Sequence, residues 1–152
     1  MRTFDSAAEL LAAAGTDLGT SGWRPVNQGR IDAFADATGD RQWIHVDAER
    51  AAAGPFGTTV AHGFLTLSLL PMLLREVVEV RAAHALNYGL DRVRFPAPLP
   101  AGSRVRASAT LLSAVAVGPV EAGVQTTVRA TVQADGAAKP CCVADLVTRY
   151  LF

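Results

Sequence analysis

The sequence predicts an α+β protein in which an antiparallel β-sheet wraps around a long central helix. The helix is predicted over Val60–Val80, where apolar residues fall on every side of the helical wheel for at least the first turns. The sheet is predicted from the last third of the chain, where apolar and polar residues alternate. A helix that is apolar all round must be surrounded, and a curved sheet buries both elements together.

The chain has 152 residues, half of them apolar, which suits one domain over 1–152. Fourteen Lys and Arg balance fourteen Asp and Glu without a basic run, so we expect no nucleic-acid partner. The most apolar window, 64–74, is roughly half the ~20 residues of a bilayer span, and the N-terminus is unlike a secretory signal. We therefore expect a soluble, cytoplasmic protein with no membrane partner.

The first predicted helix follows Ser6. Ser6 and Glu9 have the spacing of a capping box, in which each side chain accepts a hydrogen bond from a free backbone amide of the helix start. The helix is expected to close near Gly15. A loop then runs through the glycines and proline of 19–25.

Two further helices precede the central one. Residues 31–38 have helical spacing, and Gly39 is placed to end that helix. Asp47 can cap a short helix over 48–53, with Gly54 as its end. In the central helix itself, Pro71 removes one backbone donor and should kink or narrow the helix about midway.

Four strands are predicted after the central helix. A series of prolines from Pro96 to Pro100 should end the first strand, and Asp135-Gly136 is typical of a tight turn between two others. The strands are expected at 88–95, 104–111, 124–134 and 140–150.

The motifs of the common nucleotide, serine-hydrolase and zinc sites are absent. Cys141 and Cys142 are adjacent in a strand pattern, so their side chains should point to opposite faces and neither a disulfide framework nor a two-cysteine metal site is favoured. We expect one buried and one partly exposed thiol in a reducing compartment. His84 is expected at the surface.

One set of residues could perform chemistry: Asp40, His45 and the pair His62-Gly63 that opens the apolar helix. An Asp and a His held close together can bind a water and remove its proton. Gly63 would let a ligand oxygen approach the free amides of a helix start. On local signals alone, Asp40 could instead form an Asx-type turn, His45 could pack half-buried, and His62 could hydrogen-bond the helix start.

The segment 34–47, FADATGDRQWIHVD, followed by 56–63, FGTTVAHG, resembles the hydratase motif of the MaoC-like, (R)-specific enoyl-CoA hydratases. The run 92–98, RVRFPAP, and then Gly102 also resemble the strand and turn after the central helix of that family. The resemblance covers most of 28–112. It departs from the family at Gln42-Trp43, where many relatives have Asn-Pro.

The resemblance implies a hotdog fold, usually paired as a dimer with active sites near the subunit interface, so we expect a homodimer. It identifies Asp40 and His45 as the catalytic pair and Gly63 as the amide that holds the thioester carbonyl. His62 and Trp43 are possible substrate contacts, although we favour core packing for Trp43.

The implied reaction is the reversible hydration of a trans-2-enoyl-CoA to a (3R)-3-hydroxyacyl-CoA in fatty-acid metabolism. The acyl-CoA thioester is the substrate, so coenzyme A enters only as part of it, and no metal or other cofactor is expected. Two alternatives remain open: a non-catalytic or partner-dependent acyl-binding hotdog subunit, and an acyl-CoA thioesterase.

Overall fold

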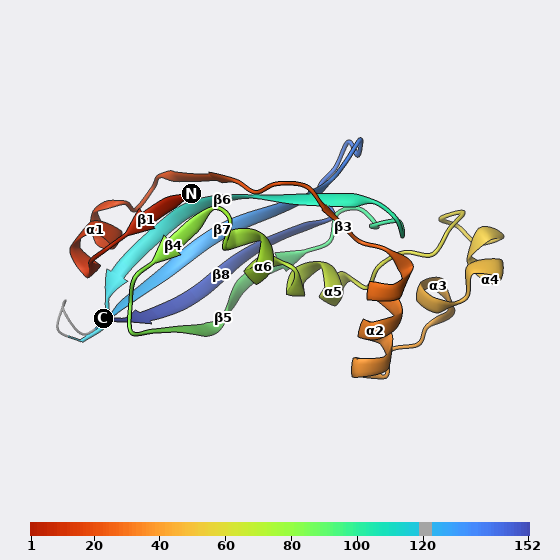
Figure 1. The fold of residues 1–152 in the computed structure, drawn as a ribbon, viewed down its shortest axis with the longest axis horizontal. Coiled ribbons are helices and arrows are strands. Elements are labelled where there is room, and N and C mark those ends of the chain that lie inside the picture. The colour runs from red at the N-terminus through yellow and green to blue at the C-terminus, as the bar shows by residue number, and fades with distance from the viewer. Residues whose placement is uncertain (119–122) are drawn as a thin grey trace.

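A curved antiparallel sheet with short helices on one face forms the centre of the molecule (Figure 1). The computed structural model describes residues 1–118 and 123–152. The sheet has the strand order β2-β6-β7-β8-β5, and β3 also pairs with β6. Its strands are β2 (Asp17–Thr20), β3 (Arg24–Pro25), β5 (His84–Arg94), β6 (Arg104–Ala116), β7 (Val124–Ala134) and β8 (Cys142–Leu151).

The four long strands confirm the predicted sheet. Their apolar positions alternate with polar ones, and in β7 Val124, Ala130, Val132 and Ala134 are buried. β7 has the predicted bounds, whereas β5 begins four residues earlier and β6 extends five residues further than predicted. The strands exceed the predicted bounds because pairing with a neighbour continues past the residues whose alternation is clear in the sequence.

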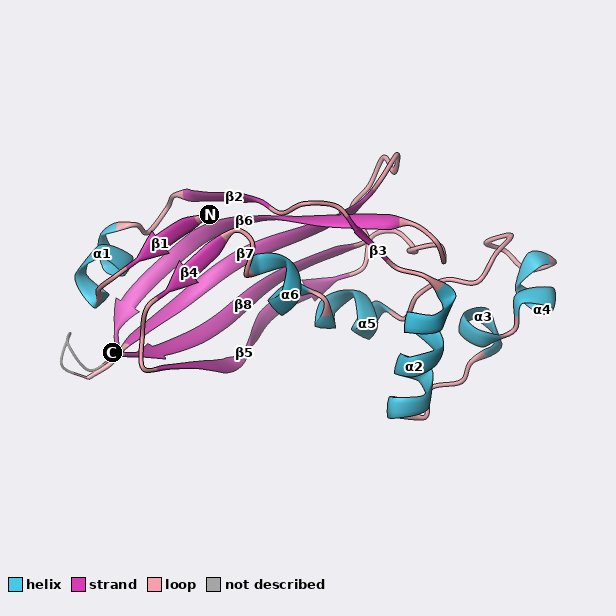
Figure 2. Cartoon of the chain, viewed as in Figure 1, coloured by secondary structure: helices cyan, strands magenta, loops and turns pink. Residues whose placement is uncertain are grey.

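Six short helices lie outside the sheet (Figure 2). Helices α5 and α6 cross one face of the sheet, while α2, α3 and α4 extend beyond one end of it. The helices are α1 (Ala7–Ala12), α2 (Gln28–Thr38), α3 (Trp43–Val46), α4 (Ala48–Ala52), α5 (Gly63–Ser68) and α6 (Leu70–Leu74).

The predicted helix caps are present. Ser6 Oγ accepts from the Glu9 amide at 3.3 Å, and the Glu9 carboxylate accepts from the Asp5 amide, one residue before the cap. Gly39 ends α2 with φ at +79°, and its amide donates to Ala35. Asp47 Oδ1 accepts from the Arg50 amide at 3.0 Å and begins α4. Short-range signals therefore determined these three boundaries.

The predicted interruption of the central helix near Pro71 is confirmed, but its predicted bounds, Val60–Val80, are wrong. The helix is divided into α5 and α6, and the break at Leu69 lies two residues before Pro71, whose missing N–H leaves the continuing ladder without a donor. The helix is also not buried all round, because Phe64 is 68% exposed and Pro71 is exposed.

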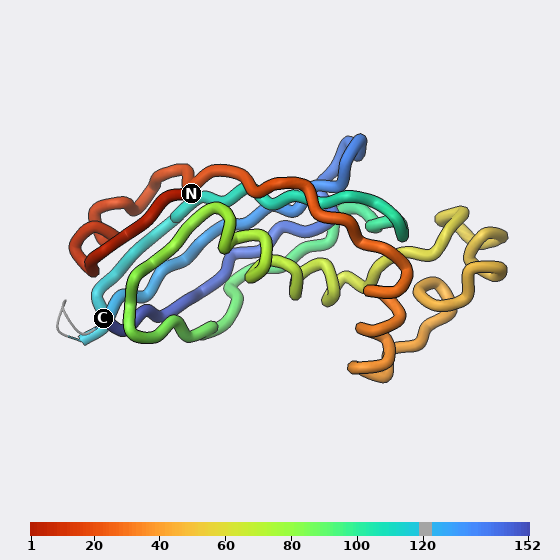
Figure 3. Tube along the Cα trace, viewed as in Figure 1, coloured from red at the N-terminus to blue at the C-terminus, as the bar shows by residue number. Residues whose placement is uncertain are grey.

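The C-terminal end of that segment is a strand instead of a charged helical tail. β4 (Val78–Val80) pairs in parallel with β1 (Arg2–Phe4) to form a second, two-stranded sheet. Figure 3 shows the chain leaving α6, turning through β4 and entering β5 along one edge of the main sheet. No local pattern predicted β1, β2, β3 or β4, because each depends on a partner far away in the sequence.

Two groups of buried apolar residues form the core. One lies between α2, α5, α6 and the central strands, and the other lies beneath α1 and the β1–β4 pair. Cys141 and Cys142 both belong to the first group, with 2% and 0% exposed. The predicted partly exposed thiol is therefore wrong: Cys142 faces the core from β8, and the Cys141 thiol donates to the Val132 carbonyl at 3.4 Å.

None of the helices in the described parts of the chain combines the length and the apolar character that crossing a bilayer requires. His84 is exposed at the start of β5, as predicted.

Candidate active site

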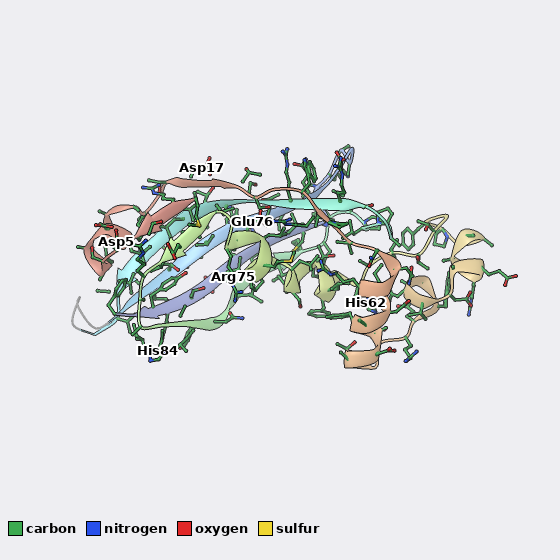
Figure 4. All side chains as sticks on the ribbon, in the orientation of Figure 1. Asp5, Asp17, His62, Arg75, Glu76 and His84 are labelled. Carbon is green, nitrogen blue, oxygen red and sulfur yellow. The ribbon has the colours of Figure 1, made fainter. Side chains whose placement is uncertain are left out.

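The end of α2, the one-turn helix α3 and the start of α5 bring Asp40, His45 and His62 together. One carboxylate oxygen of Asp40 and one ring nitrogen of each histidine lie within 4.8 Å of one another. Figure 4 labels His62 beside α2, at the opposite end of the molecule from His84. The polar cluster thus lies where the helices meet the end of the sheet.

Asp40 stands directly after the left-handed Gly39 that ends α2. Its carboxylate is 3.5 Å from the Gln42 amide, which is long for an N–H···O hydrogen bond. The side chain is exposed. The Asx-type turn therefore holds the carboxylate only weakly and leaves it free to contact another group.

His45 is buried in α3, with 7% exposed. Its Nδ1 lies 2.7 Å from the Val60 carbonyl oxygen. A carbonyl oxygen only accepts, so Nδ1 carries the proton and Nε2 of the neutral ring has a free lone pair. This is the nitrogen that can remove a proton from water.

Gln28, at the start of α2, was not predicted as a site residue. Its Nε2 donates to the His45 carbonyl at 2.7 Å and to Asp32 Oδ1 at 2.8 Å. Its Oε1 accepts from the Thr59 hydroxyl. Gln28 therefore ties α3 to α2 and to the segment before α5, and no sequence signal marks it, because its partners are 17 and 31 residues away.

His62 occupies the N-cap position of α5 without a capping hydrogen bond from its side chain, and it is 2% exposed. Its Nε2 lies 2.9 Å from the Asp40 carbonyl oxygen, and its ring stacks on His45 with 3.8 Å between centroids and 25° between planes. Phe34 also packs against it, at 4.9 Å. Its Nδ1 is buried and has no hydrogen-bond partner among the described residues.

The carboxylate and the two imidazoles are residue types that bind zinc. The lone pair of a ring nitrogen lies in the plane of the ring, however, and stacked rings hold these planes nearly parallel. Both nitrogens therefore cannot point at one ion unless a ring turns out of the stack.

Gly63 is the first residue of α5, so its amide has no acceptor within the helix. A Cβ at this position would lie 3.0 Å from Phe95 Cδ2, so a larger residue would require the Phe95 ring to shift. Gly63 borders an open cavity of about 280 Å³. Apolar side chains form most of its wall, together with one hydroxyl and one thiol: Phe56, Ala61, Thr66, Phe95, Pro96, Ala97, Pro98, Leu99 and Cys141.

Asp40, His45 and His62 do not line this cavity. The polar cluster and the cavity are linked because His62, in the cluster, directly precedes Gly63, at the cavity. α5 has only six residues, so the Gly63 N–H itself contributes more to holding a ligand oxygen than a helix dipole does. Trp43 lies outside the cavity: Arg50 stands 4.5 Å over its ring, and a Cβ at Gly54 would meet it at 2.9 Å.

Short helices laid across a curved antiparallel sheet make this a hotdog-fold protein, and the solved structures similar to it agree. The structure from Archaeoglobus fulgius described as a monoamine oxidase regulatory protein matches with a TM-score of 0.80 at 23% identity, covering 99% of this chain and 96% of that one. The (R)-hydratase PhaJ1 from Pseudomonas aeruginosa matches with a TM-score of 0.69 at 22% identity, covering 94% and 83%.

The chain belongs to the MaoC-like domain family, whose model matches residues 9–135. It is 56% identical over 152 residues to the 3-hydroxyacyl-thioester dehydratase Z of Mycobacterium tuberculosis (strain H37Rv), covering 99% of each chain. The chain is accordingly a hydro-lyase of the MaoC-like 3-hydroxyacyl-thioester dehydratase family.

Proposed function

We propose that this enzyme adds water reversibly to trans-2-enoyl thioesters and forms (3R)-3-hydroxyacyl thioesters in fatty-acid metabolism. The observation that carries the proposal is the free Nε2 of His45 beside the carboxylate of Asp40. The preserved spacing of the hydratase motif supports the same pair. The relative from Mycobacterium tuberculosis is named for the dehydration of such thioesters, which is the reverse reaction.

In the hydration direction, Asp40 and His45 hold one water between them. The pair removes a proton from the water as its oxygen bonds to C3, and the C2–C3 double bond shifts its electrons toward the thioester oxygen. The pair then returns a proton to C2. Water and enoyl thioester are thus consumed in equal amounts, and the protein regains its starting protonation.

The thioester oxygen gains negative charge as the enolate forms. We propose that the Gly63 amide, which lacks a helical acceptor, donates to that oxygen. One such donor contributes about 10²- to 10³-fold in rate at comparable sites. The apolar cavity beside Gly63 would receive part of the acyl group.

Cys141 lines this cavity, and an enoyl thioester reacts with thiolates. Burial raises the pKa of Cys141 to about 11. A thiol with a raised pKa is a weak nucleophile at neutral pH. The thiol is free, in keeping with a cytoplasmic enzyme.

We propose an acyl-CoA as the substrate, with no metal or further cofactor taking part.

A homodimer is the second part of the proposal. β5 is an edge strand of the main sheet, with β8 on one side and, among the described residues, no strand on the other. Phe64, Leu90 and Phe95 are 68%, 42% and 41% exposed on or near it. An unpaired strand edge with exposed apolar side chains on and beside it is a template for pairing with another chain. Pairing of two β5 edges would also cover the open cavity beside Gly63.

The test follows the loss of crotonyl-CoA absorbance with purified enzyme, and then with Asp40→Asn and His45→Gln. Each substitution should lower kcat by about 10²- to 10⁴-fold, because it removes one acid–base group. Thermal unfolding should change little in Asp40→Asn, because this side chain is exposed and weakly bonded.

The product and a side reaction provide the controls. Chiral analysis should find the 3R product, and a 3S product would exclude the proposed stereochemistry. A thiol reagent should detect no coenzyme A release, whereas rapid release would identify a thioesterase. Full activity in Asp40→Asn would mean that Asp40 only forms a turn.

A further inference from the structure

We propose that His62 is a positioning residue that aligns Asp40 and His45, and not a substrate contact. The inference rests on the proposed hydration. His62 is 2% exposed and does not line the cavity beside Gly63. It does contact both members of the Asp–His pair, and it directly precedes Gly63. His62 thus contacts the acid–base pair and is also the chain neighbour of the Gly63 amide, which would hold the thioester oxygen.

The hydrogen bond of His62 defines its tautomer. Nε2 lies 2.9 Å from the Asp40 carbonyl oxygen, which can only accept, so Nε2 carries the proton. His45 has the opposite tautomer, because its Nδ1 donates to the Val60 carbonyl. The bond from His62 ties the loop after α2 to the start of α5. Among the described residues, the hydrogen bond that the Asp40 carboxylate itself makes is the weak contact to the Gln42 amide, so the bond from His62 to the Asp40 backbone is what fixes this loop.

The stack limits how the His45 ring can move. The two rings lie 3.8 Å apart between centroids at 25°, and Val60 holds Nδ1 of His45. His45 can therefore not rotate about its Cβ–Cγ bond without breaking the hydrogen bond and displacing His62.

Packing alone does not account for a histidine at position 62. Its Nδ1 is buried and has no hydrogen-bond partner in the described parts of the chain, and an unpaired buried polar atom lowers stability. A phenylalanine could stack on His45 and Phe34 without that cost. What histidine provides and phenylalanine does not is the Nε2–H that reaches Asp40. We infer that this contact, and not the stability of the core, is the function of His62.

The His62→Phe variant separates a role of His62 in positioning Asp40 from a role in packing the core. Its kcat for crotonyl-CoA should fall by about 10²-fold, the cost of a misplacement on the order of 1 Å. KM should stay within about twofold, because His62 does not contact the substrate, and the melting temperature should stay the same or rise. His62→Gln restores a donor near the position of Nε2, so its kcat should lie nearer to that of wild type.

His84→Phe is the matched control, because it is the same substitution on an exposed histidine at the far end of the molecule. It should change neither kcat nor KM, and because His84 begins β5, light scattering should show that the variant keeps the oligomeric state of wild type. An unchanged kcat in His62→Phe overturns the inference. So does a raised KM with unchanged kcat, which would make His62 a substrate contact. A kcat loss that simply follows a lower melting temperature overturns it as well, because a structural role would suffice.

A measurement without substrate separates this inference from the proposed function. The chain has three histidines, so ¹⁵N NMR of the wild-type imidazoles can be assigned with His84→Phe and His62→Gln. We expect His62 protonated at Nε2 and His45 protonated at Nδ1. The same tautomer in both rings would overturn the positioning role of His62, even in an active enzyme. Opposite tautomers in an enzyme that is inert toward every enoyl-CoA would support the arrangement of His62 and His45 but exclude the proposed hydration.

Discussion

Asp145 is the one acidic residue that is buried within the described ranges, at 7% exposed. It accepts two hydrogen bonds from the Arg129 guanidinium on β7, at 2.7 and 2.8 Å, and it is paired in register with Arg92 on β5. The hydrogen bonds from Arg129 hold the pKa of the carboxyl below its usual range, against the opposing effect of burial, and the charge of Arg92 adds to the lowering.

Arg129→Met should therefore destabilise the fold at pH 7. It leaves a buried carboxylate without its main partner, which costs about 1–3 kcal/mol in the free energy of unfolding. Because the folded pKa is depressed, the contribution of the pair is present above the ordinary carboxyl pKa of about 3.9 and is lost as the pH falls through the lower folded value. Urea unfolding at pH 7 and pH 3 should show the difference from wild type shrinking at pH 3.

Arg104→Met serves as the matched control. Arg104 also forms an ion pair between a strand arginine and an aspartate, but its partner Asp135 has a side chain that is 44% exposed. Exposed pairs contribute about 0–1 kcal/mol. Equal losses in the two variants at pH 7 would contradict the importance of burial for Asp145.

At the scale of elements, the end of α2 determines where the Asp40 carboxylate stands. Gly39 has φ at +79°, a conformation that costs other residues about 1–2 kcal/mol. Gly39→Ala should thus lower the free energy of unfolding by about 1 kcal/mol, and it should lower kcat as well, because Asp40 follows directly. Urea unfolding and the crotonyl-CoA assay measure both effects.

Gly39→Asn is the control for that prediction, since Asn accepts the left-handed conformation more readily than Ala does. It should keep more of both stability and activity. If Ala and Asn behave alike, the left-handed cap does not determine the position of Asp40.

The division between α5 and α6 shows how elements compete. Hydrophobic periodicity over Val60–Val80 continues through both helices and into β4, so it gives no sign of where the helix ends. Pro71 predicts an interruption, but only β1 explains why Val78–Val80 is extended, because it offers a parallel partner. The pairing of distant segments outweighs local helix preference there.

At the scale of the whole molecule, the exposed edge at β5 predicts the quaternary structure. Leu90 is 42% exposed and borders a groove of about 260 Å³ shared with Leu67 and Pro71. Leu90→Lys places a charge in this edge, and such charges block strand pairing. Light scattering should find a dimer of the 15.9 kDa chain for wild type and a monomer for Leu90→Lys. Hydration activity should fall together with the dimer.

Leu112→Lys is the comparison for this experiment. Leu112 is 38% exposed on β6, which β7 and β8 separate from β5. This variant should remain dimeric and active. A monomeric, fully active wild type would exclude the proposed dimer.

Much of the architecture followed from the sequence, and so did the residues of the candidate site. Asp40, His45, His62 and Gly63 were identified by motif resemblance, and the structure brings the first three within 4.8 Å. Gln28 was not identified, because an isolated glutamine carries no pattern and its contacts to His45 and Thr59 exist only in the folded chain.

The sequence by itself determined the class of fold, the long strands and the caps at Ser6, Gly39 and Asp47. These follow from side-chain alternation and from contacts within a few residues, which are readable in order along the chain. Only the tertiary structure decided that β4 joins β1 and that His62 stacks on His45 while bonding to Asp40. Those arrangements join residues from 17 to 76 positions apart, and their geometry depends on the packing of the whole sheet against its helices.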